Sequence, residues 1–135
     1  MNFEYIPDGD LGIVNLSGEK SFQDAKDAWE RIRLAIRDDS LSAILMFDTA
    51  TSFLKAHEII ELEHWISQNN FPRTVKIAIV DVRPASKTNN WFGETVARNR
   101  GWYYISVFSD EMSAINWLGI PKETCPLRNG ETIEN

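Results

Sequence analysis

Unbroken apolar runs alternate along this chain with segments whose apolar residues recur every three or four positions. The two most continuous runs are 43–47 (AILMF) and 75–82 (VKIAIVDV), the pattern expected of internal parallel strands that helices cover on both faces. Shorter runs rich in β-branched and aromatic residues predict three further strands, at 3–6, 11–16 and 102–108.

Helical spacing of apolar residues predicts four helices. Ser21 has the position of a capping residue, with Asp24 in the reciprocal position three residues later, and residues 37–40 close this first helix. Trp29 is interpreted as an anchor of its buried face. The other helices are predicted from about 53 or 54 to 68, over 91–100 and over 111–118, with a polar loop at 83–90. Ser109 and Asp110 are expected to cap the last of them.

The order of these elements predicts an α/β fold. Asp8-Gly9 lies between the first two strand-like runs and is a hairpin signal, and strands alternate with helices after it. We therefore expect one small domain over residues 1–120, with a mainly parallel sheet of about five strands, an N-terminal antiparallel hairpin and about four flanking helices. A polar tail is expected at 121–135.

Composition and charge narrow the class of protein. The 135 residues are 43% hydrophobic and 25% charged, as in ordinary globular proteins. A net charge of −6 and a pI of about 4.9 argue against nucleic acid as a partner. Residues 73–100 nevertheless carry six basic and two acidic residues. This segment could form a basic patch for an anionic group or an acidic partner, or simply a solvated surface.

A single cysteine, Cys125, excludes an internal disulfide and a cysteine-based metal site, and it indicates a reducing setting. The N-terminal residues have neither the basic nor the apolar region of a signal peptide. No apolar run approaches the roughly 20 residues that span a bilayer. We therefore expect a soluble, cytoplasmic protein without integral membrane association.

The polar residues that follow the two central strands are the first candidates for a functional surface. Ligands and partners of open α/β sheets bind outside the carboxyl ends of the strands. A hydroxyl-rich turn at 48–54 and a polar segment at 83–91 occupy those positions here. The candidate binding residues are Asp48, Thr49, Thr51, Ser52, Arg83, Lys87, Trp91 and Phe92.

Four segments carry a likeness to a known family: 12–18 (GIVNLSG), 43–49 (AILMFDT), 76–82 (KIAIVDV) and 107–118 (VFSDEMSAINWL). Over about residues 3–120 the chain resembles the STAS domain, and especially its SpoIIAA-like members, whose fold is shared with small Sec14-like lipid-binding domains. The resemblance implies a non-enzymatic regulatory module that binds a protein partner and needs no cofactor.

The same family carries a phosphorylatable Ser or Thr at the start of the helix after the central strand. The resemblance therefore implies Thr51 and Ser52 as possible phosphoacceptors, although the family pattern Asp-Ser-Ser-Gly-Leu is replaced here by a sequence without glycine, DTATSFL at 48–54. A hydroxyl at a helix N-terminus would face unpaired N–H groups that favour a phosphate. The alternative is that Thr51 or Ser52 only caps the helix.

The Sec14-like side of the resemblance implies a different function, the binding of a small apolar ligand or lipid. It predicts a cavity between sheet and helices lined by Trp65, Trp91 and Phe92, with Arg83 or Lys87 meeting an anionic head group. The aromatic residues would equally suit the interface of a homodimer.

Two further sets of side chains suggest chemistry more weakly. His57, Glu61 and His64 share a helix face, but their spacing is not that of a zinc protease, so a solvated face is favoured and no metal site is predicted. Asp48 and Asp81 follow the two central strands, and such a pair could bind Mg²⁺ or act in acid–base catalysis. No nucleophile motif or phosphate loop accompanies them, so we predict no catalytic residues and no enzyme activity.

Overall fold

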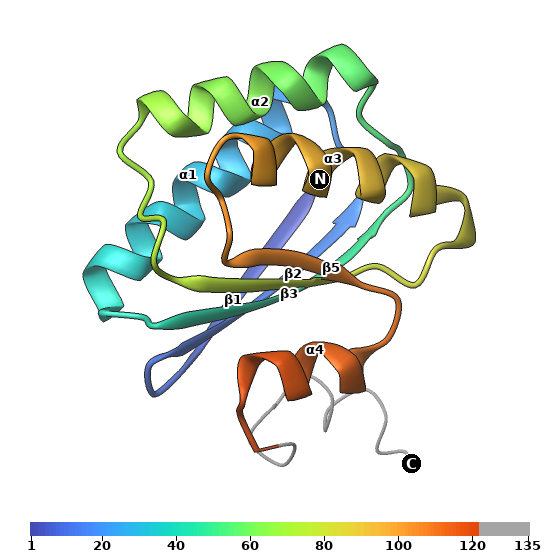
Figure 1. The fold of residues 1–135 in the computed structure, drawn as a ribbon. Coiled ribbons are helices and arrows are strands. Elements are labelled where there is room, and N and C mark those ends of the chain that lie inside the picture. Colours follow the sequence, from blue (N-terminus) through green and yellow to red (C-terminus); the bar gives the residue numbers. More distant parts are fainter. Residues whose placement is uncertain (122–135) are drawn as a thin grey trace.

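Residues 1–121 are described by a computed structural model, in which a five-stranded sheet lies between a layer of three helices and one shorter helix (Figure 1). Apart from Pro121, the predicted tail at 121–135 falls outside the described residues. The elements in chain order are β1 (Asn2–Asp8), β2 (Leu11–Gly18), α1 (Phe22–Asp39), β3 (Ala43–Ala50), α2 (Ala56–Gln68), β4 (Lys76–Val80), the 3-10 turn η1 (Pro84–Ser86), α3 (Lys87–Asn99), β5 (Ile105–Phe108) and α4 (Glu111–Leu118).

The sheet has the strand order β1-β2-β3-β4-β5, so each strand pairs with the strand before it in the chain. β1 and β2 are antiparallel, and the turn between them places Gly9 at φ +63°, a conformation that glycine adopts without a steric cost. The remaining pairs are parallel. The predicted α/β class, with its mainly parallel sheet, N-terminal hairpin and four helices, is confirmed.

The connections place α1, α2 and α3 on one face of the sheet and α4 on the other (Figure 1). This arrangement divides the apolar residues into two cores. Ile32, Ile44 and Ile77 are fully buried under the three helices. Leu45 and Ile115 are buried between the sheet and α4. Successive apolar side chains of a strand thus point alternately into the two cores. This explains why the central strands are almost uninterrupted apolar runs.

Two helix starts have the local geometry that the sequence predicts. At the start of α1, Ser21 Oγ accepts a hydrogen bond from the Asp24 N–H (3.1 Å), and Asp24 Oδ2 accepts one from the Ser21 N–H (3.0 Å). At the start of α4, Asp110 Oδ1 accepts from the Ser113 N–H (2.8 Å).

The start of α2 differs from the prediction, because α2 begins at Ala56 rather than at 53 or 54. The residues before it make bonds to distant parts of the chain instead of helical ones. Ser52 Oγ accepts from the Lys20 N–H (2.9 Å) and donates to the Lys20 carbonyl oxygen (3.0 Å). These tertiary contacts hold the segment after β3 in a non-helical turn.

The predicted polar loop at 83–90 is wrong for most of its length. Pro84 begins a 3-10 turn, since proline fits a first helical position, and α3 follows directly. Asn89 is a weak helix former, but its Nδ2 donates to the Leu54 carbonyl oxygen (2.9 Å). A tertiary hydrogen bond therefore offsets the local preference for a loop.

β5 is shorter than predicted and starts at Ile105 rather than at 102. Trp102 is only 3% exposed, and its indole Nε1 donates to Glu63 Oε2 (2.9 Å). The two tyrosines that follow it are exposed. The aromatic run 102–104 therefore leads into the strand, with its tryptophan buried in the core.

Candidate functional site

The carboxyl ends of β3 and β4 bring the two candidate segments together. Arg83 Nη1 donates to the carbonyl oxygens of Ala50 and Ser52. Asn89 donates to that of Leu54 (2.9 Å). The turn after β3 and the start of α3 therefore form one continuous surface.

Arg83 is the centre of an ionic cluster on this surface. Its Nε and Nη2 donate to the two carboxylate oxygens of Asp81, at 2.9 and 2.7 Å, and Nη2 lies 3.7 Å from Asp48 Oδ2. The guanidinium stacks on Phe53, with 4.5 Å between its Cζ and the ring centroid. Counting the two carbonyl oxygens above, each of the five N–H groups faces an oxygen.

The Asp81 carboxylate is buried and strongly held. Burial alone would raise its pKa, but hydrogen bonds from Arg83 and Asn90 outweigh burial and lower the pKa from 3.8 to about 2. The hydrogen bond to Asp81 in turn raises the pKa of Arg83. Asp81 is therefore ionised at neutral pH and suits an electrostatic role rather than proton transfer.

Asp48 pairs with Lys20 at the edge of the same cluster. Lys20 Nζ lies 3.0 Å from Asp48 Oδ2, and the two side chains are 13% and 12% exposed. Asp48 Oδ1 accepts from the Ala50 N–H (3.1 Å). Within the part of the chain that the structure describes, the Lys20 ammonium makes no other hydrogen bond, so two of its three N–H groups remain available.

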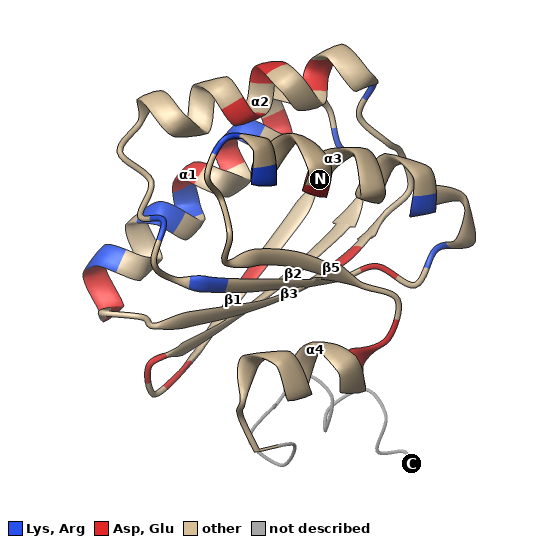
Figure 2. Ribbon diagram, in the orientation of Figure 1, with Lys and Arg blue, Asp and Glu red and all other residues tan. Residues whose placement is uncertain are grey.

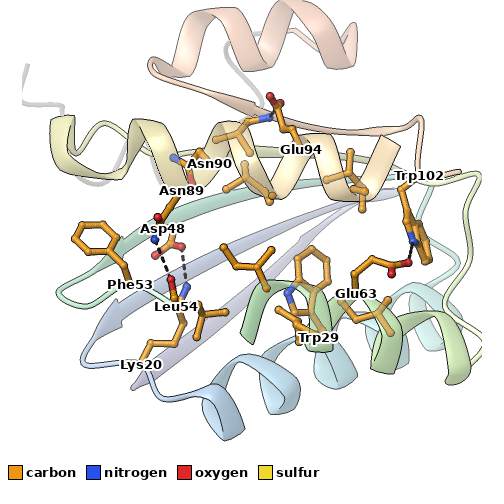
Figure 3. A pocket seen from close by; sticks show the side chains of 18 of the residues that line it. Lys20, Trp29, Asp48, Phe53, Leu54, Glu63, Asn89, Asn90, Glu94 and Trp102 are labelled. Carbon is orange, nitrogen blue, oxygen red and sulfur yellow. Dashed lines mark hydrogen bonds and ion pairs between the residues drawn. The ribbon is translucent and has the colours of Figure 1, made fainter. Parts of the chain in front are cut away.

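Beneath the cluster lies a cavity of about 190 Å³ between the sheet and the three-helix layer. Figure 3 shows Lys20 and Asp48 at one end of it, Glu63 and Trp102 at the other, and Trp29 between them. A second cavity of about 120 Å³ shares part of its wall. The body of the main cavity is apolar, with Trp29, Leu54, Leu62, Ile66, Ile79 and Val107 among its lining residues.

The far end of the cavity is closed by Glu63 of α2. Its Oε2 accepts from Ser67 Oγ (2.6 Å) and from the Trp102 indole (2.9 Å), and Arg100 Nη1 lies 3.2 Å from its Oε1. This carboxylate is therefore occupied by donors of the chain itself, and it fixes the position of Trp102 in the wall.

The predicted aromatic lining is wrong. Trp65, Trp91 and Phe92 are not part of the wall, and Trp91 is 66% exposed at the start of α3. The tryptophans that line the cavity are Trp29 of α1, which the sequence predicts as a core anchor, and Trp102.

The side chains predicted to meet an anionic head group are placed differently. Arg83 reaches the cavity wall, but its donors are directed at oxygens of the chain itself. Lys87 is exposed on α3 and is not part of the wall. The lysine that lines the cavity is Lys20, in the short connection between β2 and α1, and the sequence reasoning did not single it out.

The hydroxyl groups at the end of β3 and after it do not cap α2, whose N-cap residue is Lys55. Thr51 is exposed, Ser52 is bonded to the backbone of Lys20, and Thr49 Oγ1 donates to a β2 carbonyl oxygen (2.8 Å). Neither the capping role nor the helix N-terminal argument for a phosphate therefore applies to Thr51 or Ser52.

The basic residues of the segment 73–100 do not gather in one patch. Arg73 precedes β4 and hydrogen-bonds the Arg100 carbonyl oxygen (2.7 Å), whereas Arg83 and Lys87 follow β4. Blue segments accordingly lie at both ends of the sheet in Figure 2. The excess charge of this segment is divided between two separate surfaces.

Over residues 1–121, no three His, Cys, Asp or Glu side chains are grouped so that they could hold a metal ion. His57, Glu61 and His64 of α2 therefore form no such group either. None of the helices described is both long enough and apolar enough to cross a membrane.

Comparison with known proteins gives a likeness of fold. No protein-family model and no curated protein matches the sequence. Among solved structures, the chain is similar to the anti-sigma factor antagonist SpoIIAA in its unphosphorylated form, with a TM-score of 0.45 and 14% identity over 74% of this chain and 99% of that chain. The fold assignment rests on the element and strand order given above.

Proposed function

We propose that this chain is a non-enzymatic binding module that holds a small apolar molecule between its sheet and its layer of three helices. The observation that carries the proposal is the cavity of about 190 Å³, which is apolar along its body and polar at one mouth. Ligand sites combine an apolar lining with a few polar groups that fix the orientation of the ligand.

The volume of the cavity sets the size of the ligand. An apolar cavity of about 150 Å³ takes up benzene, whereas drug-sized ligands occupy roughly 300–1,000 Å³. A cavity of about 190 Å³ therefore suits a single ring or a chain of about six carbons.

Gly93 of α3 offers a way to fill this cavity without straining the backbone. It lines the cavity, and a Cβ at this position would have Ile59 Cγ2 as its nearest neighbour, at 3.9 Å. In Gly93→Leu the added side chain is expected to occupy the space that a ligand would take. Arg98→Leu adds the same side chain to the same helix at an exposed position outside the wall, and is the matched control.

Titration with benzene, followed by the indole N–H signal of Trp29 in NMR spectra, tests the proposal. We expect a saturable shift in the wild-type chain and in Arg98→Leu, and an affinity at least about tenfold weaker in Gly93→Leu. No saturable shift in the wild-type chain, or unchanged binding by Gly93→Leu, would overturn it.

A second candidate is a regulatory function, in which the surface at the carboxyl ends of β3 and β4 binds a protein partner. The family resemblance of the sequence implies this function. The observation that favours it is that Phe53, Val82 and Trp91 are 41%, 64% and 66% exposed on the segments that meet there. Several exposed apolar side chains on neighbouring segments can form an interaction site.

Three variants test the second candidate, two of them at residues of similar exposure. Trp91→Ser is expected to abolish capture of a partner from the native host lysate, whereas Tyr103→Ser, which changes a 67% exposed residue at the amino end of β5, is expected to retain it. Thr51→Asp places a negative charge at an exposed hydroxyl of the same surface and is expected to weaken capture. Equal capture by all three variants would contradict this function.

A further inference from the structure

Four charged side chains whose charges cancel form a cluster at the mouth of the cavity; Lys20, Asp48 and Arg83 line the cavity, and Asp81 pairs with Arg83. Lys20 and Arg83 are positive, and Asp48 and Asp81 are negative. The successive contacts measure 3.0 Å from Lys20 to Asp48, 3.7 Å from Asp48 to Arg83, and 2.7 Å from Arg83 to Asp81. The most exposed of the four side chains is 21% exposed. A charged ligand group placed here would add an unbalanced charge to a largely buried cluster, which is costly.

The mouth has both donors and acceptors that make no hydrogen bond within residues 1–121. Lys20 has two N–H groups without a partner among the described residues. Asn89 and Asn90 both line the cavity. Asn89 Nδ2 makes one hydrogen bond and Asn90 Nδ2 makes two, while their side-chain carbonyl oxygens accept no hydrogen bond within residues 1–121. The mouth therefore offers donors from a cation and acceptors that are neutral.

The remaining acids of the wall are Glu63 and Glu94, and each accepts hydrogen bonds from the chain itself through its Oε2 atom. Glu63 accepts from Ser67 and Trp102 and pairs with Arg100. Glu94 Oε2 accepts from Ser106 Oγ (2.9 Å) and from the Val107 N–H (2.5 Å), which ties α3 to the edge strand β5. Glu94 Oε1 makes no hydrogen bond within residues 1–121, but Figure 3 shows this carboxylate directed away from Lys20. Selection at a polar ligand group beside Lys20 therefore falls to Lys20 and the two asparagines.

We infer that the ligand of this cavity is an uncharged amphiphile, a primary alcohol or primary amide on a single ring or a tail of about six carbons. The inference rests on the proposed function and specifies its ligand class. A hydroxyl group accepts a hydrogen bond from Lys20 and donates one to the carbonyl oxygen of Asn89 or Asn90. One free donor and one free acceptor are then used, and the charge balance of the cluster is kept. A carboxylate would face Asp48 across the Lys20 ammonium, and an ammonium group would face Lys20 itself.

Three six-carbon compounds test this directly in the wild-type chain. 1-Hexanol, hexanoate and hexylamine each have six carbons in an unbranched chain and differ in their charge at pH 7. Followed by the Trp29 indole signal, 1-hexanol is expected to bind at least about tenfold more tightly than either ion. Hexanoate or hexylamine binding as tightly as 1-hexanol overturns the inference. Benzene has no polar group, so it distinguishes a failure of this inference from a failure of the proposed function. If benzene binds but the three compounds show no preference, this inference alone is wrong; if benzene does not bind, the proposed function is wrong as well.

Two substitutions that shift the charge balance supply a second test. Asp48→Asn leaves the cluster with one excess positive charge, so the affinity for hexanoate relative to 1-hexanol is expected to rise several-fold. Lys20→Gln leaves one excess negative charge, so the relative affinity for hexylamine is expected to rise instead. The affinities are compared as ratios within each variant, so that a general change in the cavity affects all three compounds alike. Ratios that do not change in either folded variant contradict the role of the charge balance.

Discussion

The guanidinium of Arg83 connects parts of the chain that are far apart in sequence. It holds the Asp81 carboxylate at the end of β4, two carbonyl oxygens of the turn after β3, and the face of Phe53. A planar group with five donors in a fixed fork can make these contacts at once, whereas the ammonium of a lysine cannot. Arg83 therefore fixes the position of the turn that forms one side of the cavity mouth.

The substitution Arg83→Lys is expected to loosen this turn while it keeps the charge. The loss of several charge-assisted hydrogen bonds should lower the free energy of unfolding by about 2 kcal/mol. Amides of residues 50–55 should exchange faster with deuterium, among them that of Thr51, which donates to the Gly18 carbonyl oxygen (2.9 Å). The exposed Lys87→Ala serves as the control, with a change within about 0.5 kcal/mol. Unchanged exchange in Arg83→Lys would mean that other contacts hold the turn.

The lowered pKa of Asp81 makes part of the stability dependent on pH. Its pKa is about 2 in the folded chain against an ordinary value of 3.8. The carboxylate therefore stabilises the fold fully above about pH 4, and this contribution is lost as the pH falls through 2. The shift corresponds to about 2 kcal/mol, since each pKa unit is worth about 1.4 kcal/mol.

We expect Asp81→Asn to be less stable than the wild-type chain by about 2 kcal/mol at pH 7, and the difference to shrink below about pH 4. Urea unfolding at a series of pH values measures both. Glu61→Gln changes an exposed acid of α2 and should leave the unfolding free energy nearly unchanged. A difference that is the same at pH 7 and pH 3 would argue against the charge of Asp81 as its source.

Among the helices, α3 carries a glycine in its interior, at position 93. Gly93→Ala is expected to raise the free energy of unfolding by about 0.5–1 kcal/mol, because alanine is the better helix former and the added Cβ has room. Gly12→Ala in β2 is the opposite case. Its Cβ would lie 2.7 Å from Leu41 Cδ1 and 3.0 Å from Ile44 Cδ1, both in the core, so a loss of about 1 kcal/mol or more is expected. Thermal unfolding of the two variants should shift in opposite directions.

The sequence predicts those parts of the elements that local residues determine. The capping box of Ser21 and Asp24 and the cap at Asp110 use residues three positions apart, and both are present. The starts of α2 and α3 depend on contacts between segments more than 30 residues apart, such as Arg83 with Ala50 and Asn89 with Leu54. Local propensity contains no information about such contacts, so these boundaries were predicted wrongly.

The cavity could be predicted from the sequence only in part. Glu63 falls among Ile59, Leu62 and Ile66, the apolar stripe of α2, and an acid at that place is a signal of a buried carboxylate. Lys20 carries no such signal. Its approach to Asp48 follows from the parallel register of β2 and β3, in which Leu16 is opposite Asp48. The register becomes known only when the strands are paired in space.

In the whole molecule, the two faces of the sheet are covered unequally. Three helices pack on one face, whereas the eight-residue α4 is the one helix on the other face among residues 1–121 (Figure 1). Ile115 of α4 is 1% exposed and belongs to the core on that face. The smaller core therefore depends on few side chains.

Ile115→Ala is expected to lower the free energy of unfolding by about 3 kcal/mol, because it leaves a cavity in this core. Met112→Ala removes a side chain from the same helix at a position that is 42% exposed, and should cost less than about 1 kcal/mol. Urea unfolding of both variants gives the comparison. Similar losses would mean that α4 is held mainly by contacts other than its buried face.

The strand order also bears on how the chain acquires its fold during synthesis. Because each strand pairs with the one before it, every new strand finds its neighbour already made, and no strand waits for a later one. The N-terminal hairpin needs no crossover and can form first, and each parallel strand then joins the growing edge after its helix has left the ribosome. The cavity would close only late, when α3 supplies the last helix of its wall and Glu94 binds the final edge strand.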